Sequence, residues 1–156
     1  MSKTGVLVIA IGLLSLLPIE QSDAQNSCDG SLWKYVYHPQ RFTVLDQCKT
    51  VTGVIMKKVK EADGDYHIEL KLDQGQSNLL NQKNINRQNG CLVLEIICKG
   101  KITQADAKQP CKNCPKNVGV PKVGVHVKVT GTYLTDNESN HGWNEIHPVY
   151  DIQVLP

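Results

Sequence analysis

The sequence lacks a hydrophobic run long enough to cross a membrane. Its one continuous apolar stretch, VLVIAIGLLSLL at residues 6–17, falls short of the ~20 residues that a spanning helix requires. Lys3 precedes this stretch, Pro18 ends it, and Ser22 and Ala24 provide small side chains at the −3 and −1 positions of a cleavage site. We therefore predict a signal peptide at residues 1–24 and a secreted, extracellular protein with no membrane span after cleavage. An uncleaved N-terminal anchor is the alternative.

An excess of charge of one sign is also lacking. The chain has 17 Lys and Arg residues against 15 Asp and Glu residues, which gives a formal net charge of +2. The short basic stretch at Lys57, Lys58 and Lys60 is followed at once by Glu61. A surface that binds a polyanion needs its cations gathered on one face. The sequence shows no such gathering.

Common catalytic patterns are absent as well. The chain contains no HxxEH, HExxH or GxSxG motif. Cys111 and Cys114 have the CxxC spacing of redox proteins, but prolines flank them and no βαβ unit surrounds them. These absences favour a protein without catalytic activity and a structural role for the two cysteines.

Cysteine, by contrast, is present in an even number. All six residues follow the predicted cleavage site: Cys28, Cys48, Cys91, Cys98, Cys111 and Cys114. In an exported chain this pattern favours disulfide bonds, so we expect all six thiols to be unreactive. Spacing alone leaves the pairing open. We expect Cys48 to bridge to Cys98, with Cys111 either closing onto Cys114 or pairing with Cys91 or Cys28.

Alternation of apolar and polar residues predicts a domain of β-strands at residues 48–156. The expected strands are 49–60, 66–73, 91–98, 123–134 and 144–155, with a hairpin turn at 61–65 and a long connection at 74–90. The preceding segment, 25–47, is polar and aromatic. We expect it to be an N-terminal extension that packs on the barrel through a short helix or turn at 31–37.

The order of these elements predicts an all-β fold, a five-stranded Greek-key barrel of OB type with a short helix or loop excursion between strands 3 and 4. Gly53 and Gly131 each follow a Val-Thr pair. We expect their strands to be neighbours that need glycine where they coil tightly. Pro148 cannot donate a ladder hydrogen bond and belongs at an edge or a bulge. An immunoglobulin-like sandwich would need about seven strands with more regular spacing.

Two motifs, DGDYHI at residues 63–68 and HGWNEIHPV at 141–149, occur in the second and last predicted strands. Through them the chain resembles a group of small, exported, single-domain OB-fold-like microbial proteins that carry DGDxHI and HGWxEIHPV. The resemblance covers residues 32–155 and implies the fold, but no reaction. The DGD turn is also similar to that of OB-fold thermonucleases. Those nucleases need arginines beside a metal-bound phosphate, and the only arginines here, Arg41 and Arg87, lie outside a comparable strand motif.

The candidate site residues come from the same two motifs. They are Asp63, Asp65, His67, His141, Trp143, Glu145 and His147. Imidazole and carboxylate groups are suitable zinc ligands, so His67, His141 and His147 would form a site if their faces converge. In the structural alternative, Glu145 and His147 bond to backbone groups at strand ends, Trp143 plugs the barrel, and Asp63 and Asp65 make a tight turn.

We therefore expect a secreted, non-catalytic, monomeric binding module of OB type with no cofactor. Its ligand would be a small polar molecule, a saccharide or an oligonucleotide. The outer face of the second strand, from His67 to Asp73, has mixed charge and no aromatic platform, which argues against strong single-strand binding. Tyr133 and Trp143 at the loop rim also suit a sugar. The alternative is a metal-dependent hydrolase, such as a nuclease, with a divalent metal at His67, Glu145 and His147.

Overall fold

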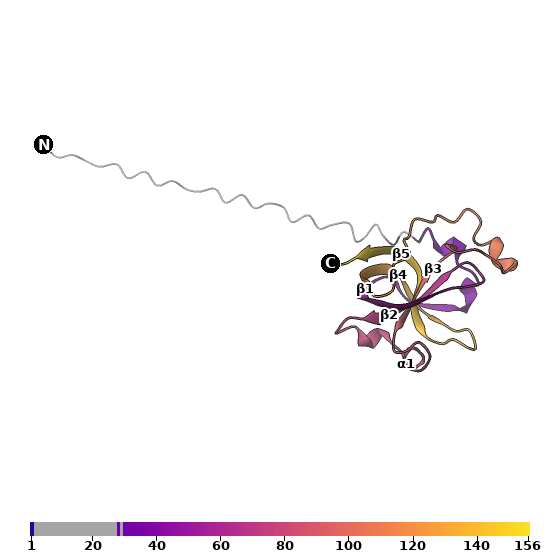
Figure 1. The fold of residues 1–156 in the computed structure, drawn as a ribbon, viewed down its shortest axis with the longest axis horizontal. Coiled ribbons are helices and arrows are strands. Elements are labelled where there is room, and N and C mark those ends of the chain that lie inside the picture. Colours follow the sequence, from indigo (N-terminus) through magenta and orange to yellow (C-terminus); the bar gives the residue numbers. More distant parts are fainter. Residues whose placement is uncertain (2–27, 29) are drawn as a thin grey trace.

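The computed structural model describes residues 1, 28 and 30–156. The predicted signal peptide and its cleavage site lie outside the described residues. The fold is all-β, as predicted, with five strands in one mixed sheet (Figure 1). These strands are β1 (Phe42–Lys60), β2 (Tyr66–Leu72), β3 (Leu92–Ile96), β4 (His126–Asp136) and β5 (Asn144–Val154). Among the described residues, the helices are all too short or too polar to traverse a bilayer.

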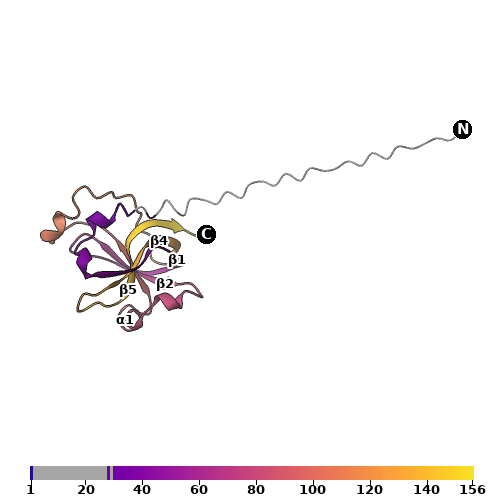
Figure 2. The same ribbon diagram turned by 180° about the vertical axis from the view of Figure 1, so that it is seen from behind.

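Every strand has two hydrogen-bonded neighbours. The order is β1-β2-β3-β5-β4, and it closes because β1 pairs with β4 as well as with β2. The β3–β5 pairing is parallel and the other pairings are antiparallel. Figure 2 shows the strands gathered around one centre, with the short helix α1 (Gln82–Arg87) at the lower edge.

The two glycines predicted to lie in neighbouring strands do so, since Val51 of β1 faces Val129 of β4. A Cβ atom on Gly53 would lie 2.3 Å from the carbonyl oxygen of Lys71, and one on Gly131 would lie 2.4 Å from the carbonyl oxygen of Pro148. Only glycine permits such close approach of another backbone.

Pro148 occupies the predicted kind of position. The pairing of β4 with β5 shifts register between Gly131 and Tyr133, which face Val149 and Ile146. Two residues of β5, including Pro148, therefore oppose one residue of β4, which is a β-bulge. The missing N–H of proline removes no ladder hydrogen bond there.

The core is built from alternate residues of each strand. In β2, Ile68 and Leu70 are completely buried inside, so His67 and Glu69, which alternate with them, point to the outer face of the sheet. The buried core side chains are Val51, Ile55, Ile68, Leu70, Leu92, Leu94, Ile96, Val127, Val129, Tyr133, Ile146 and Val149. The outer face of β2 and its neighbours is the surface on which the candidate site lies.

Strand β1 begins earlier than the predicted start at residue 49. Residues from Phe42 to Asp46 pair with the second half of β4, with register shifts between Val44 and Asp46 and between Asp46 and Lys49. These irregularities interrupt the period-two alternation, so the local pattern does not indicate a strand. The last part of the predicted N-terminal extension therefore belongs to the sheet, while Trp33–Tyr35 and Pro39–Arg41 form short 3-10 helices.

The connection between β2 and β3 contains α1, where the sequence predicts mainly loop. Asn81 caps this helix: its side chain accepts hydrogen bonds from the backbone of Lys83 and Asn84, and the Asn84 side chain accepts one from the Asn81 backbone. This reciprocal cap satisfies N–H groups that have no partner within the helix. The excursion between β3 and β4 contains a 3-10 helix at Asp106–Lys108, which agrees with the predicted short helix or loop between these strands.

The disulfide pairing differs from the prediction. Cys28 bridges to Cys48 and Cys98 bridges to Cys111, while Cys91 and Cys114 are free and buried. The predicted Cys48–Cys98 and Cys111–Cys114 bridges are wrong, and so is a framework that uses all six cysteines. The early start of β1 explains the first difference, because it makes residue 48 part of a continuous strand beside the N-terminal segment.

Candidate functional site

A cleft of about 290 Å³ opens on the outer face of β2. Its walls come from β1, the β1–β2 hairpin, the end of α1 and the connection between β4 and β5. The lining residues are Lys57, Val59, Glu61, His67, Glu69, Arg87, Gln88, Asn89, His141 and Trp143. Three predicted site residues, His67, His141 and Trp143, are therefore brought together.

His67 lies at the floor of the cleft because β2 pairs with β3. In this antiparallel register His67 faces Glu95, and directly opposed side chains share one face. His67 Nδ1 is 2.8 Å from Glu95 Oε1, and its Nε2 is 3.1 Å from Gln88 Oε1. With an acceptor at each nitrogen, the imidazole donates twice, which favours its charged form.

Glu95 is the principal residue that sequence reasoning missed. It is only 6% exposed, and its Oε2 atom has no hydrogen-bond partner among the described residues. Burial raises the pKa of Glu95 above its usual value, although His67 opposes this. Burial lowers the pKa of His67, but the hydrogen bond and charge of Glu95 outweigh it and raise the pKa. The sequence feature that could have indicated Glu95 is that it is the single carboxylate within the apolar stretch CLVLEIIC.

The hairpin brings a second missed carboxylate to the same place. Ligand atoms of Glu61, His67 and Glu95 all lie within 4.8 Å of one another. At the turn itself, Asp63 Oδ1 accepts a hydrogen bond of 3.0 Å from the backbone of Asp65, as the structural interpretation predicts. Asp65 is 4% exposed, and burial raises its pKa to about 7.

Glu145 and His147 lie behind the cleft and do not line it. Glu145 Oε2 accepts a hydrogen bond of 2.9 Å from the indole Nε1 of Trp143. The other carboxylate oxygen, Oε1, lies 3.0 Å from His147 Nδ1. Both side chains are almost completely buried. Burial lowers the pKa of His147, but the hydrogen bond and charge of Glu145 raise it to about 9. The prediction that these two side chains bond to backbone groups is wrong, because they bond to each other.

Trp143 forms a wall between this buried pair and the cleft. It is 8% exposed, its ring stacks on His141 at a centroid distance of 4.2 Å, and it contacts His67 edge-on at 6.0 Å. His141 Nδ1 is in turn 2.6 Å from Asp136 Oδ2. Trp143 is thus buried like a structural residue and also lines the cleft.

The predicted metal ligands do not form one cluster. Among residues 28 and 30–156, the sets close enough to hold an ion are Glu61–His67–Glu95 and Asp65–Cys98–Cys111. The second set has its cysteines in a disulfide. Neither set contains His141, Glu145 or His147, so the trios predicted from sequence are not assembled.

The outer face of β2 is less solvated than its polar residues indicate. Glu69 is only 4% exposed, and its carboxylate is held by Lys57 Nζ at 3.1 Å and Asn89 Nδ2 at 2.8 Å. The end of the segment that contains α1 covers part of this face, where Gln88 contacts His67 and Asn89 contacts Glu69. The alternation in β2 therefore gives the orientation of its side chains correctly but not their exposure.

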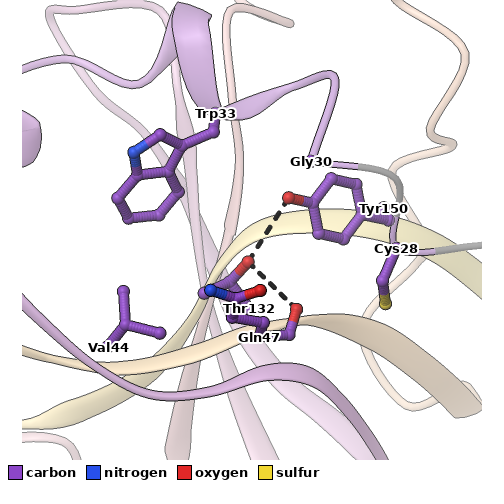
Figure 3. A pocket seen from close by; sticks show the side chains of 7 residues that line it. All are labelled: Cys28, Gly30, Trp33, Val44, Gln47, Thr132 and Tyr150. Atoms are coloured by element: carbon purple, nitrogen blue, oxygen red, sulfur yellow. Dashed lines mark hydrogen bonds between the residues drawn. The ribbon is translucent and has the colours of Figure 1, made fainter.

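A second cavity of about 410 Å³ lies elsewhere on the sheet (Figure 3). Figure 3 shows Trp33 and Tyr150 in its wall; the Thr132 hydroxyl lies 3.3 Å from the Tyr150 hydroxyl and 3.4 Å from the Gln47 carbonyl oxygen. These residues come from separate segments, so no local pattern joins them. Within the part of the chain that the structure describes, the side chains lining this cavity are uncharged.

Comparison with known proteins gave no significant match to a family model, a curated protein or a solved structure. The interpretation of the cleft therefore depends on its own geometry.

Proposed function

We propose that the protein is an exported, non-catalytic, monomeric binding module with an OB-type Greek-key barrel, and that a small polar ligand binds in the cleft beside β2. The observation that carries the proposal is the position of the cleft. It lies over β2, between the β1–β2 hairpin and the β4–β5 connection, which is the surface that OB barrels use for oligonucleotides and oligosaccharides. The strand order supports this barrel type, and two disulfides are compatible with export.

The chemistry of the cleft favours a small polar ligand over a nucleic acid. Lys57 and Arg87 are accompanied by Glu61 and Glu69, so the lining carries both signs of charge. Trp143 has little exposed surface on which a base could stack, whereas single-strand binding normally uses open aromatic faces in a positive groove. A lining that contains both cationic donors and anionic acceptors suits a hydroxyl-rich or zwitterionic molecule.

The alternative, a metal-dependent hydrolase that uses His67, Glu145 and His147, is not favoured. Glu145 is 2% exposed and His147 is 3% exposed, and Trp143 separates them from the cleft. A group that activates water or a substrate must come within hydrogen-bond reach of it. This pair is suited to supporting Trp143 from behind.

The two tryptophans provide a direct test, because Trp143 lines the cleft and Trp33 lines the second cavity. We would screen a panel of monosaccharides, disaccharides, amino acids and nucleotides by NMR of the ¹⁵N-labelled mature protein. A binder is expected to shift the indole N–H signal of Trp143 and leave that of Trp33 in place. A panel without a binder, or binders that shift Trp33 alone, would contradict the proposal.

A matched pair of histidine variants sharpens the test. His141 and His126 are similarly exposed, with side chains at 32% and 38%, and each lies beside an aspartate. Only His141 lines the cleft. His141→Ala is expected to weaken binding, while His126→Ala should leave it unchanged; equal effects would contradict the assignment of the cleft.

A further inference from the structure

We propose that Glu61, His67 and Glu95 form a site for one divalent transition-metal ion, such as Zn²⁺, at the floor of the cleft. Their ligand atoms lie within 4.8 Å of one another. Imidazole and carboxylate are suitable ligands for such ions. The proposal goes beyond the proposed function, because metal binding does not require a particular organic ligand.

The state of Glu95 is an independent indication of a missing partner. The residue is 6% exposed, and its buried Oε2 atom has no hydrogen-bond partner in the part of the chain that the structure describes. Leaving a buried carboxylate oxygen unpaired is unfavourable. Among the described residues, no lysine or arginine forms an ion pair with Glu61 or Glu95. A cation at this point would satisfy both carboxylates.

The surroundings of His67 match those of a metal ligand. Its Nε2 atom lies 3.1 Å from the side-chain oxygen of Gln88, which leaves Nδ1 directed at Glu95. Gln88 is itself fixed at the end of α1, where its backbone N–H donates to the Asn84 carbonyl at 3.0 Å. An acceptor on the second nitrogen of a ligating histidine typically sets its tautomer and ring orientation. The metal would then take the position of the Nδ1 proton.

The site would remain open on one side. Glu61 is exposed on the hairpin, and Glu95 is buried beside His67, which lines the cleft, so an ion can enter from the cleft. Three protein ligands leave a fourth tetrahedral position for water or another group, which is typical of zinc sites that act on or bind external molecules. A polar ligand in the cleft could occupy that position.

The test uses tag-free mature protein that has been treated with a chelator and then titrated with Zn²⁺ by calorimetry, with the metal content measured by mass spectrometry. We expect one ion per chain. Glu61→Gln should weaken binding by about tenfold or more without changing the melting temperature, because Glu61 is exposed. Glu138→Gln removes another exposed carboxylate, in the β4–β5 connection, and should leave affinity unchanged.

Glu95→Gln provides a second variant at the buried ligand, and it should also weaken binding. Absence of stoichiometric binding, or affinity unchanged in both Glu61→Gln and Glu95→Gln, would overturn the proposal. Repeating the ligand panel in the presence of a chelator distinguishes the two proposals. If the wild type binds no metal but a compound still shifts Trp143, the metal site fails and the binding module stands.

Discussion

Replacement of Trp143 tests how the cleft is supported. The indole donates to Glu145 Oε2 at 2.9 Å, and Glu145 is only 2% exposed. Trp143→Phe retains an aromatic ring but removes this donor, so a buried carboxylate oxygen loses its partner. Hydrogen bonds to charged groups contribute ~1.5–3 kcal/mol, and the unfolding free energy should fall by about that amount.

Trp143→Ala should be more damaging, because it also removes the ring that packs on His141 and His67. Truncation of a buried aromatic side chain costs about 3–5 kcal/mol. The control is Trp33→Phe. Trp33 is half-buried, and among the described residues its indole nitrogen makes no side-chain hydrogen bond of this kind, so we expect a loss of only ~0.5 kcal/mol.

Urea denaturation followed by far-UV circular dichroism gives the answer without relying on tryptophan fluorescence. With an m value of ~2 kcal/mol/M, a loss of ~2 kcal/mol lowers the midpoint by ~1 M. An unchanged midpoint for Trp143→Phe would refute the supporting role of the indole hydrogen bond. An unchanged midpoint for Trp143→Ala would show that the ring acts only as a surface for ligands.

Three further predictions follow from buried groups. Burial raises the pKa of Asp65 from 3.8 to about 7, so the folded state holds the carboxyl proton more tightly than the unfolded state. The protonated carboxyl therefore contributes most to stability below about pH 4, and this contribution declines as the pH rises to 7. Asp65→Asn should flatten that decline when denaturation is measured as a function of pH. Gly131→Ala places a Cβ atom 2.4 Å from a backbone carbonyl oxygen and should destabilise by ~1–3 kcal/mol or more. Gly119→Ala would place its Cβ atom more than 4 Å from the described residues other than its chain neighbours and should be nearly neutral in the same melts. Cys91 and Cys114, at 2% and 8% exposure, should resist a thiol reagent in the native protein, and two thiols per chain should react after denaturation without reductant; four or more, or none, would contradict the pairing.

The strands that could be predicted from the sequence are those whose pattern is local. In β2 the alternation of Ile68 and Leu70 with polar residues follows directly from the pleat, and the apolar stretch of β3 reflects burial on both faces. Gly53 and Gly131 were informative because each marks a close backbone approach, which a side chain would prevent. These signals depend on a few neighbouring residues and need no knowledge of the rest of the fold.

The rest depends on contacts between distant segments. Helix α1 has no apolar periodicity and is stabilised by the reciprocal cap of Asn81 and Asn84, so its sequence resembles a polar loop. Its position over β2 determines that Glu69 is buried. The disulfide pairing likewise depends on where β1 begins. The register irregularities in the first part of β1 hide this start from a reading of the local sequence pattern. Local pattern gave the direction of His67 but could not reveal that Glu95 lies opposite it.

Two histidine–carboxylate pairs, His67–Glu95 and His147–Glu145, are largely removed from solvent. Buried ion pairs of this kind are weak stabilisers, because desolvation offsets their attraction, and apolar replacements are often equally stable. Stability alone therefore gives little reason for four ionisable groups here, whereas perturbed pKa values beside a cleft are typical of functional sites. The pairs differ in access: His67 lines the cleft, and His147 lies behind Trp143. We infer that the first pair contacts ligand or metal and that the second holds the tryptophan wall in place.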